Sequence, residues 1–148
     1  MRKPMDRAVL EFLARSANEG FARTTAACFA ARLDPTLDEL NDLKTAVSEA
    51  VTNAIVHAYP EQLGKVRMTM KLFEDDTVEI SIKDWGIGIA DLEKAREPLY
   101  TTGGEERAGM GFTIMESFTD RMKVRSAPDK GTTVTLSKRM LSRRGAAR

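Results

Sequence analysis

The sequence lacks the features of a disulfide-stapled or membrane-inserted protein. Only one of its 148 residues is cysteine, Cys28, so no intramolecular disulfide can form. No apolar run reaches the roughly 18 residues that a membrane span requires, and residues 1–6 lead into no signal-peptide core. We therefore expect a cytoplasmic protein without a membrane partner. Because Cys28 lies in an apolar helical pattern, we expect it to be a small core residue.

An excess of charge of one sign is also missing. The chain has 23 basic and 22 acidic residues and a formal net charge of +1. General nucleic-acid binders usually show a marked basic excess, so we expect no direct nucleic-acid contact. The length suits one domain with a single core. We assign residues 1–140 to that domain and expect the basic tail, 141–148, to be disordered.

Hydrophobic periodicity predicts the order of the elements. It indicates a strand over 9–13, a helix over 18–33 with Phe21, Thr25, Cys28, Phe29 and Arg32 at helical spacing, and a second helix to about Ala58. Thr36-Leu37-Asp38-Glu39 is a capping-box sequence at the start of that helix. Its core face should hold Leu40, Leu43, Val47, Val51 and Ala54. Alternating residues predict a hairpin turning at Glu74-Asp75-Asp76, and another with strands over 123–126 and 132–138.

The segment between the hairpins is rich in glycine. Asp84-Trp85-Gly86-Ile87-Gly88 should form a turn, followed by a short helical stretch at 91–97 and a polar, mobile loop at 98–108. A helix over 111–121 should place Phe112, Met115 and Phe118 on one side. The expected fold class is α+β, a two-layer α/β sandwich with helices on one face of a mixed, mainly antiparallel sheet.

Glu49 and Asn53 are four residues apart on the second helix, so they project from one side. They could be two members of a solvated face, but asparagine is a poor choice in mid-helix without a specific role. An amide oxygen can bind Mg²⁺, and a carboxylate can orient or deprotonate an attacking hydroxyl. The pair suits a site for a metal-bound nucleotide.

Two glycine-containing segments could complete such a site. Asp84 can accept a hydrogen bond from an amino group, and Gly86 and Gly88 let the backbone approach a flat ring. Gly109 and Gly111 end a polar loop and open a helix, where bare amides hold phosphate, and Arg107 can add a cation. Each segment taken alone is more simply explained as an ordinary glycine turn.

Taken in order, these segments resemble the N, G1 and G2 boxes of the GHKL ATPase superfamily. The set comprises Glu49-x-x-x-Asn53, Asp84-x-Gly86-x-Gly88, Gly109-x-Gly111-Phe112 and Gly131-Thr132. The stretches at 18–23, 33–36, 47–55 and 109–116 further resemble the anti-sigma F factor family of sporulation serine kinases. The similarity extends from about residue 5 to about residue 140. It implies a GHKL (Bergerat) fold that binds ATP or ADP with Mg²⁺.

The resemblance implies a role for each matching residue. Glu49 would be the catalytic base, Asn53 the Mg²⁺ ligand, and Arg107 the cation that meets the γ-phosphate. Asp84 would bind adenine, with Gly86, Gly88 and Thr132 beside it. Thr101 and Thr102 would begin the ATP lid, and Gly109 and Gly111 would present amides to phosphate. Glu19 and Arg23 would form an exposed charged pair that contacts protein partners.

The family resemblance also implies partners and leaves alternatives open. A homodimer would sequester a sporulation sigma factor of the sigma F type, inhibit its transcription, and phosphorylate a serine of an anti-anti-sigma (STAS) protein. The alternatives are a general-stress-type switch kinase and a nucleotide-gated sigma-binding module with little kinase activity. The chain departs from the family at Trp85, where a polar residue is usual, in a short lid at 103–106, and in the basic tail.

Overall fold

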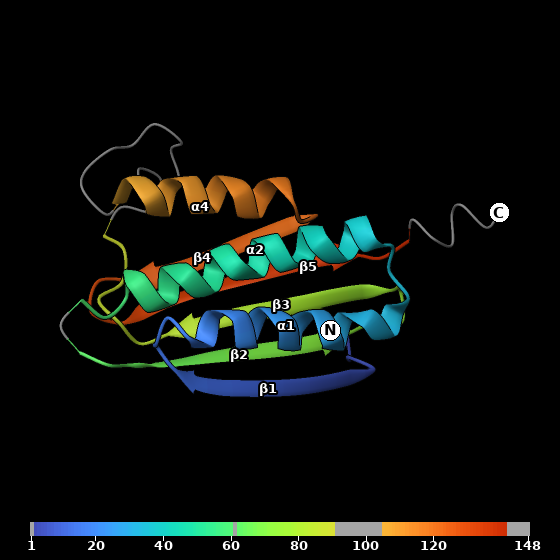
Figure 1. Ribbon diagram of the computed structural model, residues 1–148, viewed down its shortest axis with the longest axis horizontal. Helices are drawn as coiled ribbons and strands as arrows, with labels where there is room; N and C mark the ends of the chain where they lie inside the picture. The colour runs from blue at the N-terminus through green and yellow to red at the C-terminus, as the bar shows by residue number, and fades with distance from the viewer. Residues whose placement is uncertain (1, 61, 91–104, 142–148) are drawn as a thin grey trace.

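The computed structural model describes residues 2–60, 62–90 and 105–141, without the side chains of 105–110. A sheet and a helical layer lie against each other (Figure 1). The strand order is β1 (Asp6–Leu13), β2 (Lys65–Leu72), β3 (Thr77–Asp84), β5 (Gly131–Arg139) and β4 (Arg121–Ala127). Each neighbouring pair of these strands is antiparallel. Helices α1 (Asn18–Ala30), α2 (Leu37–Val56) and α4 (Glu105–Ser117) cover one face, with α2 in the middle. The predicted α+β architecture is confirmed.

The core lies between the two layers, where the sequence places its alternating apolar residues. The inward side chains of β2 and β3 are at most 2% exposed: Val66, Met68, Met70, Leu72, Val78, Ile80 and Ile82. The predicted core face of α2 is confirmed, because Leu43, Val47, Val51 and Ala54 are buried and Leu40 is partly buried against them. Glu49 and Asn53 lie outside this core face, on the side of α2 next to α4.

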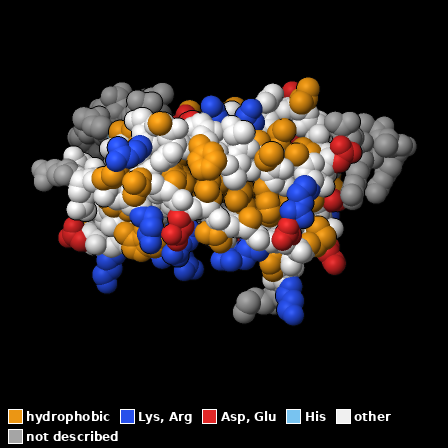
Figure 2. Space-filling view, turned by 60° about the horizontal axis from the view of Figure 1, so that its bottom comes forward, with side chains coloured by type: hydrophobic (Ala, Val, Ile, Leu, Met, Phe, Trp, Pro, Cys, Tyr) orange, Lys and Arg blue, Asp and Glu red, His pale blue; other side chains and the backbone are white. Residues whose placement is uncertain are grey.

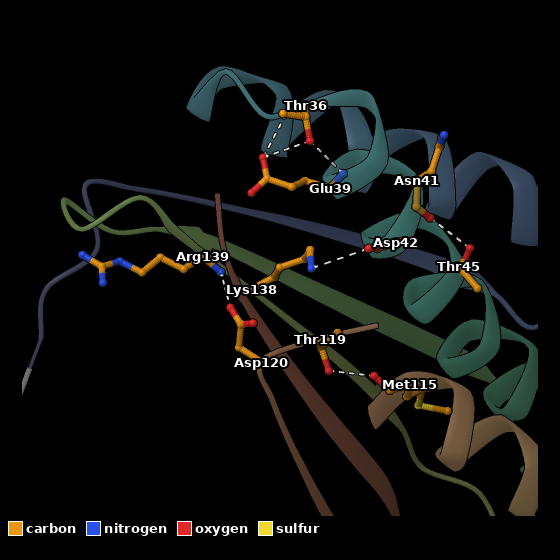
Figure 3. A network of polar contacts seen from close by, with 10 residues as sticks. All are labelled: Thr36, Glu39, Asn41, Asp42, Thr45, Met115, Thr119, Asp120, Lys138 and Arg139. Atoms are coloured by element: carbon orange, nitrogen blue, oxygen red, sulfur yellow. Dashed lines mark hydrogen bonds and ion pairs between the residues drawn. The ribbon is translucent and has the colours of Figure 1, made fainter. Parts of the chain in front are cut away.

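Polar contacts fix the first turns of α2 (Figure 3). The predicted capping box is present, because Thr36 Oγ1 accepts a hydrogen bond from the Glu39 amide and the Glu39 carboxylate accepts one from the Thr36 amide. Asp42 then pairs with Lys138 of β5 at 3.9 Å. A helix anchored over its first turns holds the residues further along it, Glu49 and Asn53 among them, in a defined position.

The predicted face of α1 is wrong. The helix buries Ala22, Ala26, Ala27 and Ala30, whereas Cys28 is exposed and Phe21 is 55% exposed. Because α1 packs along α2, its inner face takes the smallest side chains. Apolar residues lie on both sides of this helix, so periodicity alone did not identify the buried one. A short 3₁₀ turn, η1 (Ala31–Leu33), continues α1.

The predicted start of α4 is also wrong. The helix begins at Glu105 rather than Gly111 and ends at Ser117, while Arg121 already belongs to β4. Phe112 and Met115 are buried as predicted, but Phe118 lies beyond the helix and is 36% exposed. Glutamates are good helix formers and favour the first turn, so Glu105 and Glu106 start the helix earlier than the glycines suggest. The stretch predicted at 91–97, the first part of the loop predicted at 98–108 and the tail from 142 lie outside the described residues. The last part of that loop, 105–108, belongs to α4, so the loop prediction is wrong there.

Among the helices in the described part of the chain, none is long and apolar enough to cross a membrane.

Candidate functional site

Glu49 and Asn53 converge on Gly111, from the neighbouring helix. A Cβ at position 111 would lie 3.2 Å from Glu49 Oε2 and 3.3 Å from Asn53 Nδ2. The prediction that the two side chains share one side of α2 is therefore correct, and that side faces α4. The absence of a side chain at position 111 leaves room for both polar groups between the helices.

Asn53 has a polar atom that the protein itself does not satisfy. Its Nδ2 is buried and has no hydrogen-bond partner among the described residues. A buried amide without a partner costs about 1–3 kcal/mol, and such groups in native proteins usually mark a ligand or water position. The residues at this point therefore fit a polar ligand held between α2 and α4.

Asp84 lies at the end of β3 and is 5% exposed. Its Oδ1 accepts hydrogen bonds from the backbone amides of Gly86, at 3.0 Å, and Thr132, at 3.1 Å. Burial raises the pKa of Asp84, and these two amide donors partly oppose that rise. Both bonds go to Oδ1, so Oδ2 remains to accept a hydrogen bond from a ligand amino group.

The glycines beside Asp84 are needed for contacts within the protein. A Cβ at Gly86 would lie 2.1 Å from the Ala58 carbonyl oxygen, and one at Gly88 would lie 2.0 Å from that of Ala127. Gly88 also has a φ of +73°, which favours glycine. Each glycine therefore lets the turn pack closely against a neighbouring backbone segment.

Two residues that the sequence did not reveal hold this turn in place. The Tyr59 hydroxyl donates to the Lys65 carbonyl and accepts from the Trp85 amide, both at 2.7 Å. Burial raises the pKa of Tyr59, so the phenol keeps the proton that it donates. The Ser126 hydroxyl accepts from the Ile89 amide at 2.8 Å and lies 2.8 Å from Thr132 Oγ1. Neither residue belongs to a recognisable motif.

Thr132 contributes to the site mainly through its backbone. Its amide donates to Asp84, and its hydroxyl is engaged by Ser126. Gly131, just before it, has a φ of +86°, and a Cβ there would lie 2.2 Å from the Asp84 carbonyl oxygen. The last hairpin is thereby brought against the end of β3.

The predicted phosphate-binding residues are only partly described. Thr101 and Thr102 lie outside the described residues, and for Arg107 and Gly109 the backbone alone is described. Gly109 and Gly111 lie inside α4, so the expectation that they open the helix is wrong. In a helix starting at Glu105, amides at these positions bond to carbonyls four residues earlier instead of pointing freely at an anion.

Glu19 and Arg23 form an ion pair on α1 at 3.7 Å, but the pair is less exposed than predicted. The Glu19 side chain is 22% exposed and also accepts a hydrogen bond from the Ser48 hydroxyl on α2. Arg23 Nε is buried and has no partner among the described residues. Glu19 therefore connects the outer helix to the residue that precedes Glu49.

Trp85 points to the opposite side of the sheet, away from the helices. It is 38% exposed, and its ring centre lies 4.7 Å from Lys65 Nζ, 5.0 Å from Lys83 Nζ and 5.1 Å from the Arg67 guanidinium carbon. Of the two roles open for Trp85, packing over the nucleotide or covering the sheet, this position agrees with the second.

The chain is similar to proteins of known family. Residues 12–138 match the model of the histidine kinase-like ATPase domain. The chain is 58% identical to the anti-sigma F factor of Bacillus velezensis over 88% of this chain and 90% of that protein. It is 57% identical to that of Bacillus subtilis over the same shares, and 55% identical to that of Clostridium perfringens over 88% and 94%.

The solved structures agree on the fold. The RsbU and RsbW domains of a Mycobacterium tuberculosis protein superpose with a TM-score of 0.66 at 20% identity, over 93% of this chain and 32% of that one. The histidine kinase domain of a blue-light activated kinase from Erythrobacter litoralis gives 0.59 at 17% identity, over 86% and 63%. The curated relatives and the family model show that the chain belongs to the anti-sigma F factor family, with a GHKL-type histidine kinase-like ATPase domain.

Proposed function

We propose that this chain binds Mg²⁺-ATP, sequesters a sporulation sigma factor of the sigma F type, and phosphorylates a serine of a STAS anti-anti-sigma protein in the cytoplasm. The observations that carry the proposal are the convergence of Glu49 and Asn53 on Gly111 and the burial of Asp84 at the end of β3. The names of the curated relatives support the anti-sigma role.

The residues of this chain fit a magnesium-bound nucleotide. Asp84 Oδ2 would accept from the adenine amino group, with the amides of Gly86 and Thr132 holding the carboxylate in place and Gly88 shaping the turn beside it. Asn53 would contribute its amide oxygen to Mg²⁺. The described residues contain no group of three or more His, Cys, Asp or Glu side chains that could hold a metal. Mg²⁺ would therefore take most of its ligands from phosphates and water, as is usual in nucleotide sites.

Glu49 would orient the serine hydroxyl and accept its proton. The serine oxygen forms a bond to the γ-phosphorus as the bond from that phosphorus to the β–γ bridging oxygen breaks, giving phosphoserine and ADP. ATP would supply the phosphoryl group, and Mg²⁺ held with the help of Asn53 would neutralise part of the charge on the phosphates. Catalysis by the protein consists mainly of positioning, which agrees with the anchored start of α2.

The remaining phosphate contacts are assigned by resemblance. Arg107 would meet the γ-phosphate, and Thr101 and Thr102 would begin the lid over the nucleotide. The amides of Gly109 and Gly111 would become phosphate donors once the first turns of α4 unwind. While α4 is intact, these amides bond within the helix, so turnover would be slow. This arrangement favours the alternative of a nucleotide-gated sigma-binding module with little kinase activity, here called the clamp.

Glu19 and Arg23 would contact the sigma factor and the STAS protein, on a homodimer. The bond from Ser48 to Glu19 connects this contact to α2, the helix of Glu49. A general-stress switch kinase is the weaker assignment, because the RsbW-containing neighbour is 20% identical whereas the anti-sigma F factor of Bacillus velezensis is 58% identical.

Phosphoryl transfer to a STAS protein tests the kinase activity, and ATP-dependent binding of a sigma factor tests the sigma-binding activity. The pure chain is incubated with Mg²⁺-ATP and a STAS partner, and phosphoserine is measured by mass spectrometry. Glu49→Gln should lower the transfer rate by about 10²–10⁴-fold while ATP binding by calorimetry persists. Asp38→Asn, an exposed change on the same helix, is the control. Undiminished transfer in Glu49→Gln would contradict the base assignment, and ATP-dependent sigma binding without any transfer would favour the clamp.

A further inference from the structure

The face of the sheet away from the helices carries three rows of side chains that cross all five strands. Their registers follow from the pairing of adjacent strands. The first row reads Arg125, Thr133, Lys83, Arg67 and Glu11. The second row reads Lys123, Thr135, Ser81, Thr69 and Val9. The third row reads Arg121, Ser137, Glu79, Lys71 and Arg7. We call these residues, together with Lys65 and Trp85 at one end, the uncovered face.

Positive charge is concentrated on the uncovered face. It holds eight basic residues, Arg7, Lys65, Arg67, Lys71, Lys83, Arg121, Lys123 and Arg125, and two acidic ones, Glu11 and Glu79. The whole chain has 23 basic and 22 acidic residues, so the surplus on this face is balanced by acid elsewhere. Net charge near zero therefore does not exclude a polyanionic partner, because the charges are segregated by face.

The acidic residues of the uncovered face neutralise little of this charge. Among the described residues, the ion pairs on this face are those of Glu11 with Arg67, at 2.6 Å, and with Lys65, at 4.0 Å. In Figure 2, which brings the β1 edge forward, Lys and Arg side chains gather along the lower rim with few acidic ones among them. None of the eight basic residues is buried.

Trp85 brings three cations together at one end of the face. Lys65, Lys83 and Arg67 all lie within 5.1 Å of its ring centre. Attraction to the ring offsets part of their mutual repulsion, and Glu11 compensates only two of them. An anionic partner would relieve the rest. The indole ring, 38% exposed, also offers a surface on which a base can stack.

The centre of the face is lined by hydroxyl groups. Thr69, Ser81, Thr133, Thr135 and Ser137 are short, and Ser81 Oγ lies 3.0 Å from Thr135 Oγ1. Longer basic side chains flank them on β4 and on β2. Arginine, lysine, serine and threonine are the side chains that usually contact phosphate in nucleic-acid complexes. A membrane-binding face would instead need protruding apolar residues across its width. Those exposed on or beside this face are Trp85 at one end and Val9 and Leu13 on the edge strand β1.

We propose that the uncovered face binds the phosphodiester backbone of a nucleic acid, without base specificity. The face lies on the side of the sheet opposite to Glu49, Asn53 and the helices, so a nucleic acid bound there would not occupy the nucleotide site. It would place the chain beside DNA or nascent RNA while the helical side holds protein partners.

Fluorescence anisotropy of the full chain with labelled 20-nucleotide single-stranded RNA, single-stranded DNA and duplex DNA tests the proposal. At 150 mM KCl we expect a Kd on the order of 10⁻⁵ M for at least one of the three, weakening steeply with salt. Saturating Mg²⁺-ATP should leave the affinity unchanged. Competition by ATP would place the nucleic acid in the nucleotide pocket and overturn the assignment.

A matched pair of triple variants locates the contact. The first variant combines Arg121→Gln, Lys123→Gln and Arg125→Gln, and it should bind at least tenfold more weakly. Each phosphate contact contributes roughly 0.7 to the slope of log affinity against log salt, so the loss of three contacts should lower the magnitude of that slope by about 2. Combined Arg15→Gln, Lys44→Gln and Lys130→Gln removes the same charge outside the face and should leave both unchanged. Circular dichroism checks folding, and Lys123→Gln alone replaces the first triple variant if it does not fold.

Three results would overturn the proposal. The first is no anisotropy change with any of the nucleic acids at 100 mM KCl. The second is an equal loss of affinity in the two triple variants. The third is binding of polyglutamate or of phosphatidylglycerol vesicles with the same dependence on the β4 cations and with higher affinity, which would assign the face to an acidic protein or a lipid surface.

Discussion

The carboxylate of Asp84 accepts a hydrogen bond from the amide of Thr132, 48 residues further along the chain, at 3.1 Å. This bond joins the end of β3 to the start of β5 and holds the carboxylate that we assign to adenine. Asp84 thus has a structural role, in fixing the backbone, and a proposed role in binding adenine, and the two can be tested separately.

Asp84→Asn should separate them. The asparagine oxygen can still accept from the Gly86 and Thr132 amides, so the fold should persist with a modest loss of stability. The charged acceptor for the adenine amino group is lost, and hydrogen bonds to charged groups contribute about 1.5–3 kcal/mol. Nucleotide affinity by calorimetry should fall about 10–100-fold. Asp120→Asn is the control, because Asp120 also accepts from a backbone amide, that of Arg139. Equal losses of affinity in both variants would refute the adenine role.

The pH dependence of stability follows from the raised pKa of Asp84. The native state holds the Asp84 proton more tightly than the unfolded chain, so this residue favours folding below its unfolded pKa. That contribution is lost as pH rises through the higher, native pKa. The free energy of unfolding of Asp84→Asn relative to the original chain should therefore rise across this window. Urea unfolding of both proteins at several pH values measures it, and subtraction removes the titration of other groups. A flat difference would show that the native pKa is not raised.

Tyr59→Phe tests the support of the turn that follows Asp84. The change removes the acceptor of the Trp85 amide and the donor to the Lys65 carbonyl, and should cost about 1–3 kcal/mol of stability. Nucleotide affinity should fall several-fold because Asp84 is less well positioned. Trp85 is the single tryptophan, so its fluorescence reports on this turn directly. Thr119→Val, which removes a hydrogen bond to Met115 far from the turn, should lower stability alone. Unchanged affinity in Tyr59→Phe would confine its role to folding.

Gly111→Ala should uncouple stability from activity. Alanine is favoured over glycine inside a helix by about 1 kcal/mol, so the melting temperature should hold or rise. The new methyl group would lie 3.2 Å from Glu49 Oε2, and a displaced base should slow phosphoryl transfer at least about tenfold. Gly20→Ala in α1 is the matched control, because its nearest neighbour would be 3.6 Å away. Normal transfer in Gly111→Ala would show that the space between α2 and α4 is not used in the reaction.

The parts of this fold that local patterns determine could be predicted from the sequence. Strict alternation placed Met68 and Ile80 on the inner face, and Thr36 with Glu39 formed the expected capping box. The spacing of Glu49 and Asn53 gave their shared direction correctly. These features depend on chain segments of a few residues, for which periodicity and capping chemistry are sufficient.

The parts that depend on distant contacts could not be predicted. Tyr59 and Ser126 act through bonds to segments 26 and 37 residues away, and nothing in their neighbours signals this. The buried side of α1 is set by close packing on α2, which selects alanines and leaves Phe21 outside. The rows of basic residues on the uncovered face become visible only when the strand order is known, because each strand contributes only a few of them.

The two borders of the sheet differ in how they would meet another polypeptide. On one border, β4 alternates Arg121, Lys123 and Arg125, and a row of like charges discourages a further strand from pairing there. On the other, β1 exposes Val9 at 42% and Leu13 at 47%. A second chain that extends the sheet would therefore pair with β1 and not with β4. At high protein concentration, we expect association through the β1 edge alone, which cannot propagate from both edges into a long assembly.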